Sequence, residues 1–113
     1  MKFRVNHRDD DMGGTSLQGY VDGQVGFPRL VEIFGEPLGA GDKTLAEWVV
    51  RFEDGTIATI YDWKNYGMRR EDVTSWHIGG HDKRAADLIN DLIRRPAGGS
   101  SDHRPSARGI LVF

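Results

Sequence analysis

Hydrophobic and polar positions alternate through residues 47–64, on both sides of a single Asp-Gly pair. Alternation of this kind is typical of half-buried strands. Asp54-Gly55 between two such runs is a strong hairpin signal, because a two-residue type I′ turn needs positive φ angles at both central positions, which Asp and Gly tolerate. The segment therefore predicts a β-hairpin in which Phe52 lies opposite Ile57.

This register assigns each hairpin residue to one face of the sheet. One face should contact the core and carries Trp48, Val50, Phe52, Ile57 and Tyr61. The other face should look outward and carries Glu47, Val49, Arg51, Ala58, Ile60 and Asp62. Glu47 then lies directly opposite Asp62, and two acids in that position destabilise a strand pair. Residue pairs that break a local stability rule concentrate at functional sites, so Glu47 and Asp62 are a candidate site.

Two further segments have the spacing of amphipathic helices. The first is 27–34, where Pro28 suits a first helical turn and Gly35 suits the position after the last one. The second is 83–95, which Asp82 should cap at its N-terminus. The apolar stripe of this second helix is formed by Ala85, Leu88, Ile89, Leu92 and Ile93.

Strands are expected at residues 15–22 and 73–78 in addition to the hairpin. The resulting order, β-α-β-β-β-α, predicts an α+β fold. Its sheet should be an antiparallel β-meander, with the helices packed on one sheet face. The outer face of that sheet would then carry Glu47, Arg51 and Asp62.

The chain is long enough for one domain, which we expect over residues 15–96. Residues 1–14 are charged and should form a flexible arm, with a short strand at 2–6. Residues 97–113 are rich in Gly, Ser, Pro and Arg and should form a flexible tail. The apolar end of that tail, 110–113, should dock as an edge strand on this chain or on a second copy.

Composition argues against several classes of protein. The 113 residues carry a formal net charge of −2, which gives no overall attraction to nucleic acid or membrane surfaces. The chain has no cysteine, so it has no disulfide, no thiol nucleophile and no cysteine-ligated zinc. No apolar run is long enough to span a membrane, and the N-terminus lacks a signal-peptide core, so a cytoplasmic protein is expected.

The segment Trp76–His81 is a second candidate feature. A Trp76 face with the edge of His77 beside it could stack on a base or another planar ligand. The free N–H groups of Gly79-Gly80, placed before a helix, could bind a phosphate. In the alternative interpretation, Trp76 is a core residue and the glycine pair only turns the chain into the helix.

Titratable side chains offer further possibilities. His77 and His81 are four residues apart, but a glycine turn between them would not make their rings converge, and no metal or cofactor is expected. Glu47 and Asp62 could form a general acid/base dyad, or neighbouring cations could neutralise them. The sequence contains no motif for an activated serine, a zinc protease or a phosphate-binding loop.

Several short motifs stand out together: Leu17–Asp22, Phe34-Gly-Glu-Pro37, Glu47-Trp48, Phe52-Glu-Asp-Gly-Thr56, Ala58–Lys64 and Trp76-His-Ile-Gly-Gly80. Over residues 15–93 they resemble a group of small, uncharacterised accessory proteins of tailed bacteriophages and prophages. The resemblance implies an accessory protein that acts in the cytoplasm of the infected bacterial host. A helix ending in Phe-Gly-x-Pro before a strand meander is also similar to the β-lactamase-inhibitor-like and outer-membrane assembly lipoprotein folds, whose members bind proteins.

We therefore predict a phage-encoded, non-enzymatic binding protein that captures or blocks a host component, as a host-defence antagonist. One candidate ligand is a nucleotide-like immune signal. Its predicted site is formed by Tyr61, Trp63, Lys64, Trp76, His77, Gly79 and Gly80, with Glu47 and Asp62 at the rim. A second candidate is a host protein, bound through the outer sheet face or the terminal strand. A nucleotide hydrolase using Glu47, Asp62 and His77 is the third. The sequence leaves open whether the chain forms a homodimer. A membrane or nucleic-acid partner is not expected.

Overall fold

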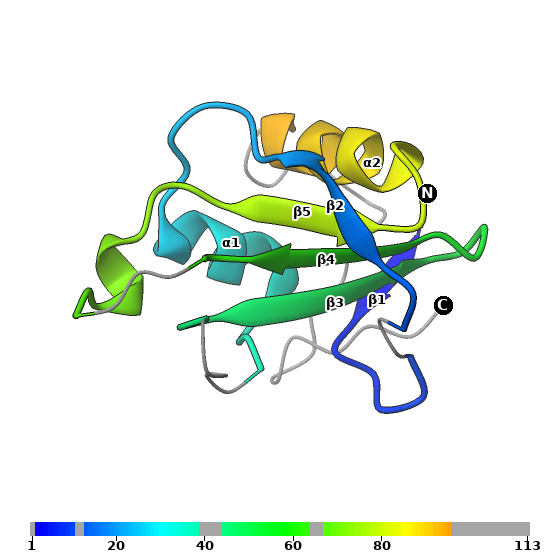
Figure 1. Cartoon of the computed structure of the whole chain (residues 1–113), viewed down its shortest axis with the longest axis horizontal. Coiled ribbons are helices and arrows are strands. Elements are labelled where there is room, and N and C mark those ends of the chain that lie inside the picture. The colour runs from blue at the N-terminus through cyan, green and yellow to red at the C-terminus, as the bar shows by residue number, and fades with distance from the viewer. Residues whose placement is uncertain (1, 11–12, 39–43, 64–66, 96–113) are drawn as a thin grey trace.

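The computed structural model describes residues 2–10, 13–38, 44–63 and 67–95 (Figure 1). Its elements in chain order are β1 (Phe3–Val5), β2 (Ser16–Tyr20), α1 (Phe27–Phe34), β3 (Glu47–Phe52), β4 (Ile57–Tyr61), the 3₁₀ turn η1 (Arg70–Asp72), β5 (His77–Gly80) and α2 (Arg84–Arg94). The strands form one antiparallel sheet in the order β1-β3-β4-β5-β2. Both helices share one hydrophobic core with this sheet. The fold is α+β, as the sequence predicts.

The first strand was expected only as part of a loose arm. Phe3 and Val5 are buried, and β1 pairs with β3 at one edge of the sheet. These residues therefore belong to the folded domain. Lys64 and the segment 110–113, both named in the sequence predictions, lie outside the described residues.

The hairpin forms, but its register differs by one residue from the expected one. Arg51 pairs with Ile57. The N–H of Gly55 donates to the carbonyl of Phe52, and the N–H of Phe52 donates to the carbonyl of Thr56, both at 2.9 Å. Gly55, with φ of 92°, is the only loop residue with a positive φ. This pattern is a type I turn followed by a glycine bulge, with three loop residues, so the predicted type I′ turn is wrong.

A shift of one residue moves half of the hairpin to the other face of the sheet. The core face carries Trp48, Val50, Phe52, Ala58 and Ile60, all of them buried. The outer face carries Glu47, Val49, Arg51, Ile57, Thr59 and Tyr61. The three predicted core residues of β3 are confirmed. Ile57 and Tyr61, expected in the core, instead face away from the helices, and Ala58 faces toward them.

Both helices form where the spacing predicts them. The N–H of Gly35 donates to the carbonyl of Val31 at 2.8 Å and closes α1. At the start of α2, the Oδ1 atom of Asp82 accepts the N–H of Arg84 at 2.9 Å. The core side of α2 is formed by Ala85, Ala86, Ile89 and Leu92, with Leu88 and Ile93 partly buried beside them. No helix in the described ranges is long and apolar enough to cross a membrane.

The glycine pair expected as a turn lies inside β5. Gly79 pairs with Thr59, and Gly80 with Ala58, between strands β4 and β2. A Cβ atom on Gly80 would collide with the side chain of Ala85, so this glycine lets α2 approach the sheet closely. Because β5 has a neighbouring strand on each side, its backbone amides serve the sheet rather than a phosphate.

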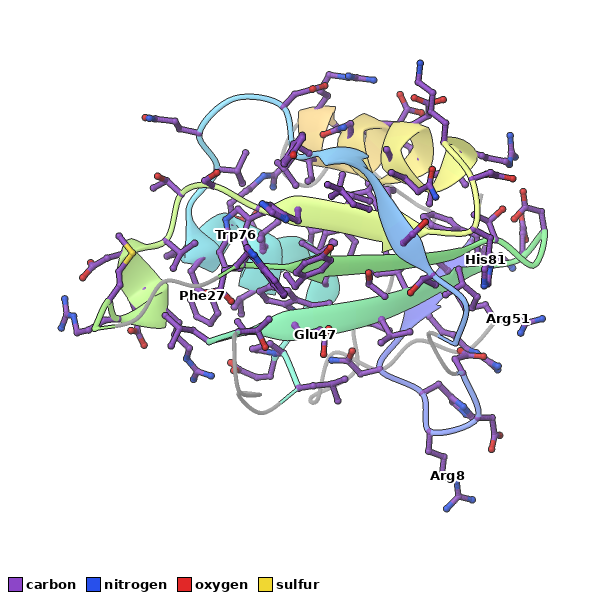
Figure 2. The ribbon with its side chains drawn as sticks, in the orientation of Figure 1. Arg8, Phe27, Glu47, Arg51, Trp76 and His81 are labelled. Carbon is purple, nitrogen blue, oxygen red and sulfur yellow. The ribbon has the colours of Figure 1, made fainter. Side chains whose placement is uncertain are left out.

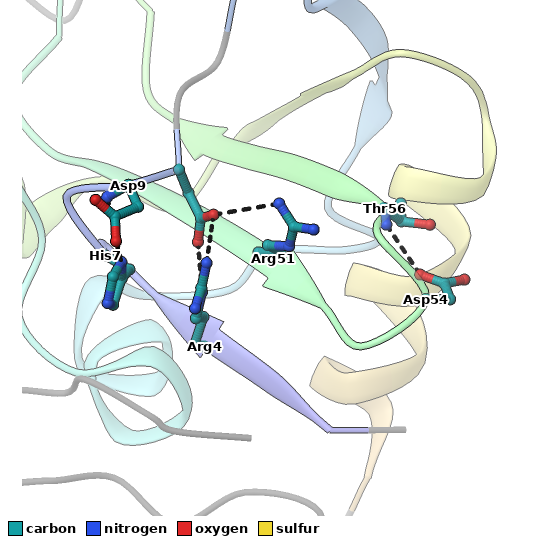
Figure 3. A network of polar contacts seen from close by, with 7 residues as sticks. Arg4, His7, Asp9, Arg51, Asp54 and Thr56 are labelled. Carbon is teal, nitrogen blue, oxygen red and sulfur yellow. Dashed lines mark hydrogen bonds and ion pairs between the residues drawn. The ribbon is translucent and has the colours of Figure 1, made fainter.

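The two strands β1 and β2 lie at opposite edges of the sheet. The described parts of the connection between them, residues 6–10 and 13–15, lie over the outer face of the sheet, where Asp10 pairs with Arg4 and Arg51 and Thr15 lies near Thr59. The Asp10 carboxylate is only 2% exposed and accepts two hydrogen bonds from Arg4, at 2.7 and 2.8 Å, and one from Arg51 at 3.4 Å (Figure 3). Arg4 and Arg51 lie opposite each other on β1 and β3, and the Asp10 carboxylate between them offsets the repulsion of these like charges. The connection also explains why Val49 and Thr59 are buried although they point away from the helices.

Candidate functional site

A pocket of about 200 Å³ opens on the outer face, between the crossing connection and the sheet. Strands β4 and β5 form its floor, and the start of β2 and the approach to β3 form its walls. Its lining residues are Thr15, Ser16, Thr44, Glu47, Thr59, Tyr61, Trp63 and Gly79. Pockets for drug-sized ligands usually measure about 300–1,000 Å³. This one therefore suits a small group or one end of a larger ligand.

Gly79 determines the depth of the pocket. A Cβ atom at this position would collide with Oγ1 of Thr59 and would lie 3.5 Å from the ring of Tyr61. Thr59 itself is 2% exposed, so its hydroxyl lies at the bottom of the site. The two glycines of β5 thus have separate roles, one beneath the pocket and one beneath α2.

Glu47 is the acidic residue of the pocket lining. It begins β3, opposite Tyr61, and is partly buried (Figure 2). Its carboxylate has no hydrogen-bond or ion-pair partner among the residues that the structure describes. Burial, and next the negative charge of Asp62, raise the pKa of Glu47 above the ordinary value of 4.5. A carboxylate held without a counter-ion in a cavity is a candidate functional group.

Four rings form a row across the outer face beside the pocket, which we call the aromatic row: Trp63, Tyr61, His77 and Tyr20. Successive ring centroids lie 6.3, 5.4 and 4.9 Å apart, each pair edge to face. The ends of the row, Trp63 and Tyr20, are 44% and 55% exposed. Burial, and next the charges of Glu47 and Tyr20, raise the pKa of Tyr61 above 10.0. Its hydroxyl therefore stays protonated at neutral pH and can donate a hydrogen bond.

Trp76 does not belong to this site. It is 1% exposed, and its ring centroid lies 5.5 Å from that of Trp48 and 6.5 Å from that of Phe27 (Figure 2). Its Nε1–H donates to the carbonyl of Val25 at 2.7 Å. The expectation that Trp76 stacks on a ligand is corrected: it is a core residue, as the alternative interpretation had it.

Asp62 does not face Glu47 across the hairpin. Its fully buried carboxylate accepts the N–H groups of Leu45, at 2.7 Å, and Ala46, at 3.1 Å. It thus orders the backbone that leads into β3 and acts on Glu47 only through space. The acid/base dyad predicted from the two-residue turn is not assembled, because the register places Tyr61 opposite Glu47.

The two histidines of the Trp76–His81 segment lie in different surroundings. His77 is part of the aromatic row, whereas Nε2 of His81 lies 3.0 Å from the carbonyl oxygen of Gly13. In the ranges that the structure describes, no group of three or more potential metal ligands gathers.

The sequence predicted some of the pocket residues and missed others. Glu47, Tyr61, Trp63 and Gly79 were expected at a site, and all four line the pocket. The hydroxyl-bearing residues were missed: Thr15, Ser16, Thr44 and Thr59. Short hydroxyl side chains near strand ends carry no distinctive sequence signal. Comparisons with protein-family models, curated proteins and solved structures give no significant match.

Proposed function

We propose that this chain is a non-enzymatic binding protein that captures a host component through its outer-face pocket. Glu47 carries the proposal, because its carboxylate has no counter-ion among the described residues and lies in a pocket with hydroxyl groups and the rings of Tyr61 and Trp63. Mostly apolar walls with a few placed polar groups are typical of ligand sites. The resemblance of residues 15–93 to phage accessory proteins supports the setting, in which a phage-encoded antagonist acts inside an infected bacterium.

The pocket favours a small neutral or cationic group over a complete nucleotide. Its volume is below the usual range for drug-sized ligands. The described lining residues include no Lys or Arg that could meet a phosphate, and an ionised Glu47 would repel one. A nucleotide-like immune signal would therefore enter with its base or sugar, and its phosphates would stay outside.

A second candidate is a host protein bound across the same face. Leu17 and Tyr20 are 47% and 55% exposed on β2, which is an edge strand of the sheet. Exposed apolar side chains on an edge strand favour the addition of a partner's strand. In this case the pocket would hold one side chain of the partner.

Native mass spectrometry of the full chain, purified from bacterial cells, tests the proposal. We expect an additional bound component on the wild-type protein and its loss from Trp63→Ala. Met68→Ala is the matched control, because Met68 is 43% exposed but does not line the pocket. Loss of the component from Tyr20→Ala, with retention in Trp63→Ala, would favour the edge strand instead. A wild-type chain without any bound component would contradict both candidates.

A further inference from the structure

We infer that the outer-face pocket binds an organic cation, a guanidinium or alkylammonium group, with Glu47 as its counter-ion and Trp63 and Tyr61 as its aromatic walls. This inference rests on the proposed binding function and narrows the ligand to one chemical class. Such a group occurs on small molecules and on the arginine and lysine side chains of proteins. Both sources present the same chemistry to the pocket.

The charges around the pocket favour a cation. Glu47 lies in the lining without a hydrogen-bond or ion-pair partner among the described residues. Asp62 is close enough for its negative charge to act on Glu47. The described lining residues include no basic side chain. A neutral ligand would cover the Glu47 carboxylate without compensating its charge, and an anionic ligand would add repulsion. A cation would instead offset the free-energy cost of holding a charged carboxylate partly away from water.

The aromatic walls support the same ligand class. The rings of Tyr61 and Trp63 are inclined at 75° to each other, with centroids 6.3 Å apart, so they form a corner rather than a flat stack. Trp63 is 44% exposed and presents part of its surface to solvent. The faces of aromatic rings attract cations, and groups of such rings recognise alkylammonium ligands in other proteins. The carboxylate of Glu47 beside this corner would complete the recognition of a positive charge.

Size and hydrogen bonding fit the end of a side chain or a small amine. The volume of about 200 Å³ admits a compact head group. A guanidinium carries five N–H donors and no acceptor. The lining offers the oxygens of Glu47 and the hydroxyl oxygens of Ser16 and Thr59 as acceptors. A donor-rich head group can bind to these oxygens.

An NMR titration of the full chain with two matched probes tests this inference. Nα-acetylarginine amide carries the guanidinium, and Nα-acetylcitrulline amide replaces it with a neutral urea of the same shape. We expect the arginine probe to bind about tenfold more tightly, since it adds a charge-assisted contact and a cation–π contact. The signal of the Trp63 indole N–H should shift with the arginine probe. Adenosine monophosphate, as an anionic probe, should leave that signal in place.

Glu47→Gln should reduce the affinity for the arginine probe to that of the citrulline probe. The matched control is Glu53→Gln, which removes the same charge from an exposed position in the hairpin loop, outside the pocket lining. Agmatine and an arginine-containing peptide then distinguish the two sources. Tighter binding of agmatine indicates a small-molecule ligand, and tighter binding of the peptide indicates a protein side chain.

Equal affinities of the arginine and citrulline probes, or the absence of any shift, would overturn the inference on the wild-type chain alone. So would undiminished arginine binding by a folded Glu47→Gln variant, or preferred binding of adenosine monophosphate. The proposed function fails separately. If the arginine probe binds but nothing is captured in cells, the cation site stands and the capture function falls. If the captured component carries no organic cation, the capture function stands and the inference of a cation site falls.

Discussion

Replacement of Trp76 by alanine decides whether this side chain is part of the core or part of a ligand site. The indole is 1% exposed and packs against Trp48 and Phe27. Complete burial of a Trp side chain removes about 150–250 Å² from water. At about 25 cal/mol per Å², this burial contributes about 4–6 kcal/mol. Alanine would retain a small part of that contribution.

Two further effects set the expected cost. A cavity left by a large core residue closes only in part, and Trp→Ala changes in cores cost about 3–5 kcal/mol. The carbonyl of Val25 would also lose the indole N–H that donates to it at 2.7 Å. We therefore expect Trp76→Ala to lower the free energy of unfolding by about 4–5 kcal/mol. Trp76→Phe keeps most of the ring packing but removes the donor, and should cost about 1–3 kcal/mol.

Urea unfolding at neutral pH, followed by far-UV circular dichroism, measures these changes. Trp63→Ala is the control, because Trp63 is 44% exposed and packs edge to face against Tyr61, so its removal should cost about 1–2 kcal/mol, clearly less than the removal of Trp76. The milder Trp76→Phe keeps the experiment informative if Trp76→Ala does not fold. An unchanged midpoint for both Trp76 variants would refute the assignment of this residue to the core.

The remaining predictions concern two acids and one glycine. The pKa of Glu47 is raised by burial, so its ionisation lowers the stability of the fold as pH rises from 4.5 through the raised pKa. Glu47→Gln should therefore raise the free energy of unfolding at neutral pH. Urea titrations should show that this gain vanishes below pH 4.5. The pKa of Asp10 is lowered below 3.8, chiefly by its hydrogen bonds from Arg4, so its contribution is complete above 3.8 and is lost as pH falls through the lowered pKa. Asp10→Asn should therefore destabilise at neutral pH and less so in acid, and equal stability at all pH values would argue against the ion pair. Gly80→Ala should lower the melting temperature, because its Cβ would collide with Ala85, and a wild-type melting curve would speak against this close approach.

Both helices could be located from the sequence because their signals are local. The apolar spacing of 27–34, followed by Gly35, lies within a few helical turns and needs no information from distant residues. The same holds for α2 and the Asp82 side chain before it. The order of strands and helices then sufficed for the α+β class.

The register of the hairpin could not be determined in this way. Asp54-Gly55 correctly marked the turn, but a type I turn with a glycine bulge and a type I′ turn share that dipeptide. Both faces of β4 are apolar enough to be buried: Ile57 and Ala58 point to opposite faces, and both are buried. The hydrophobic pattern therefore allowed either register, and a shift of one residue exchanges the faces.

The pocket could be predicted only in part from the sequence, because segments far apart in the chain build it: residues 15–16, the hairpin with its approach, and Gly79. Glu47 and Tyr61 belong to one hairpin, but the expected register put them on opposite faces, and the observed pairing sets them side by side. Thr15 lies near Thr59 because the described parts of the connection between β1 and β2, strands at opposite edges, lie over the outer face. Local propensity thus determined the elements and the turn. Long-range strand pairing decided which side chains share a face, which Trp is buried and where a cavity opens, since these depend on contacts between residues far apart in the chain.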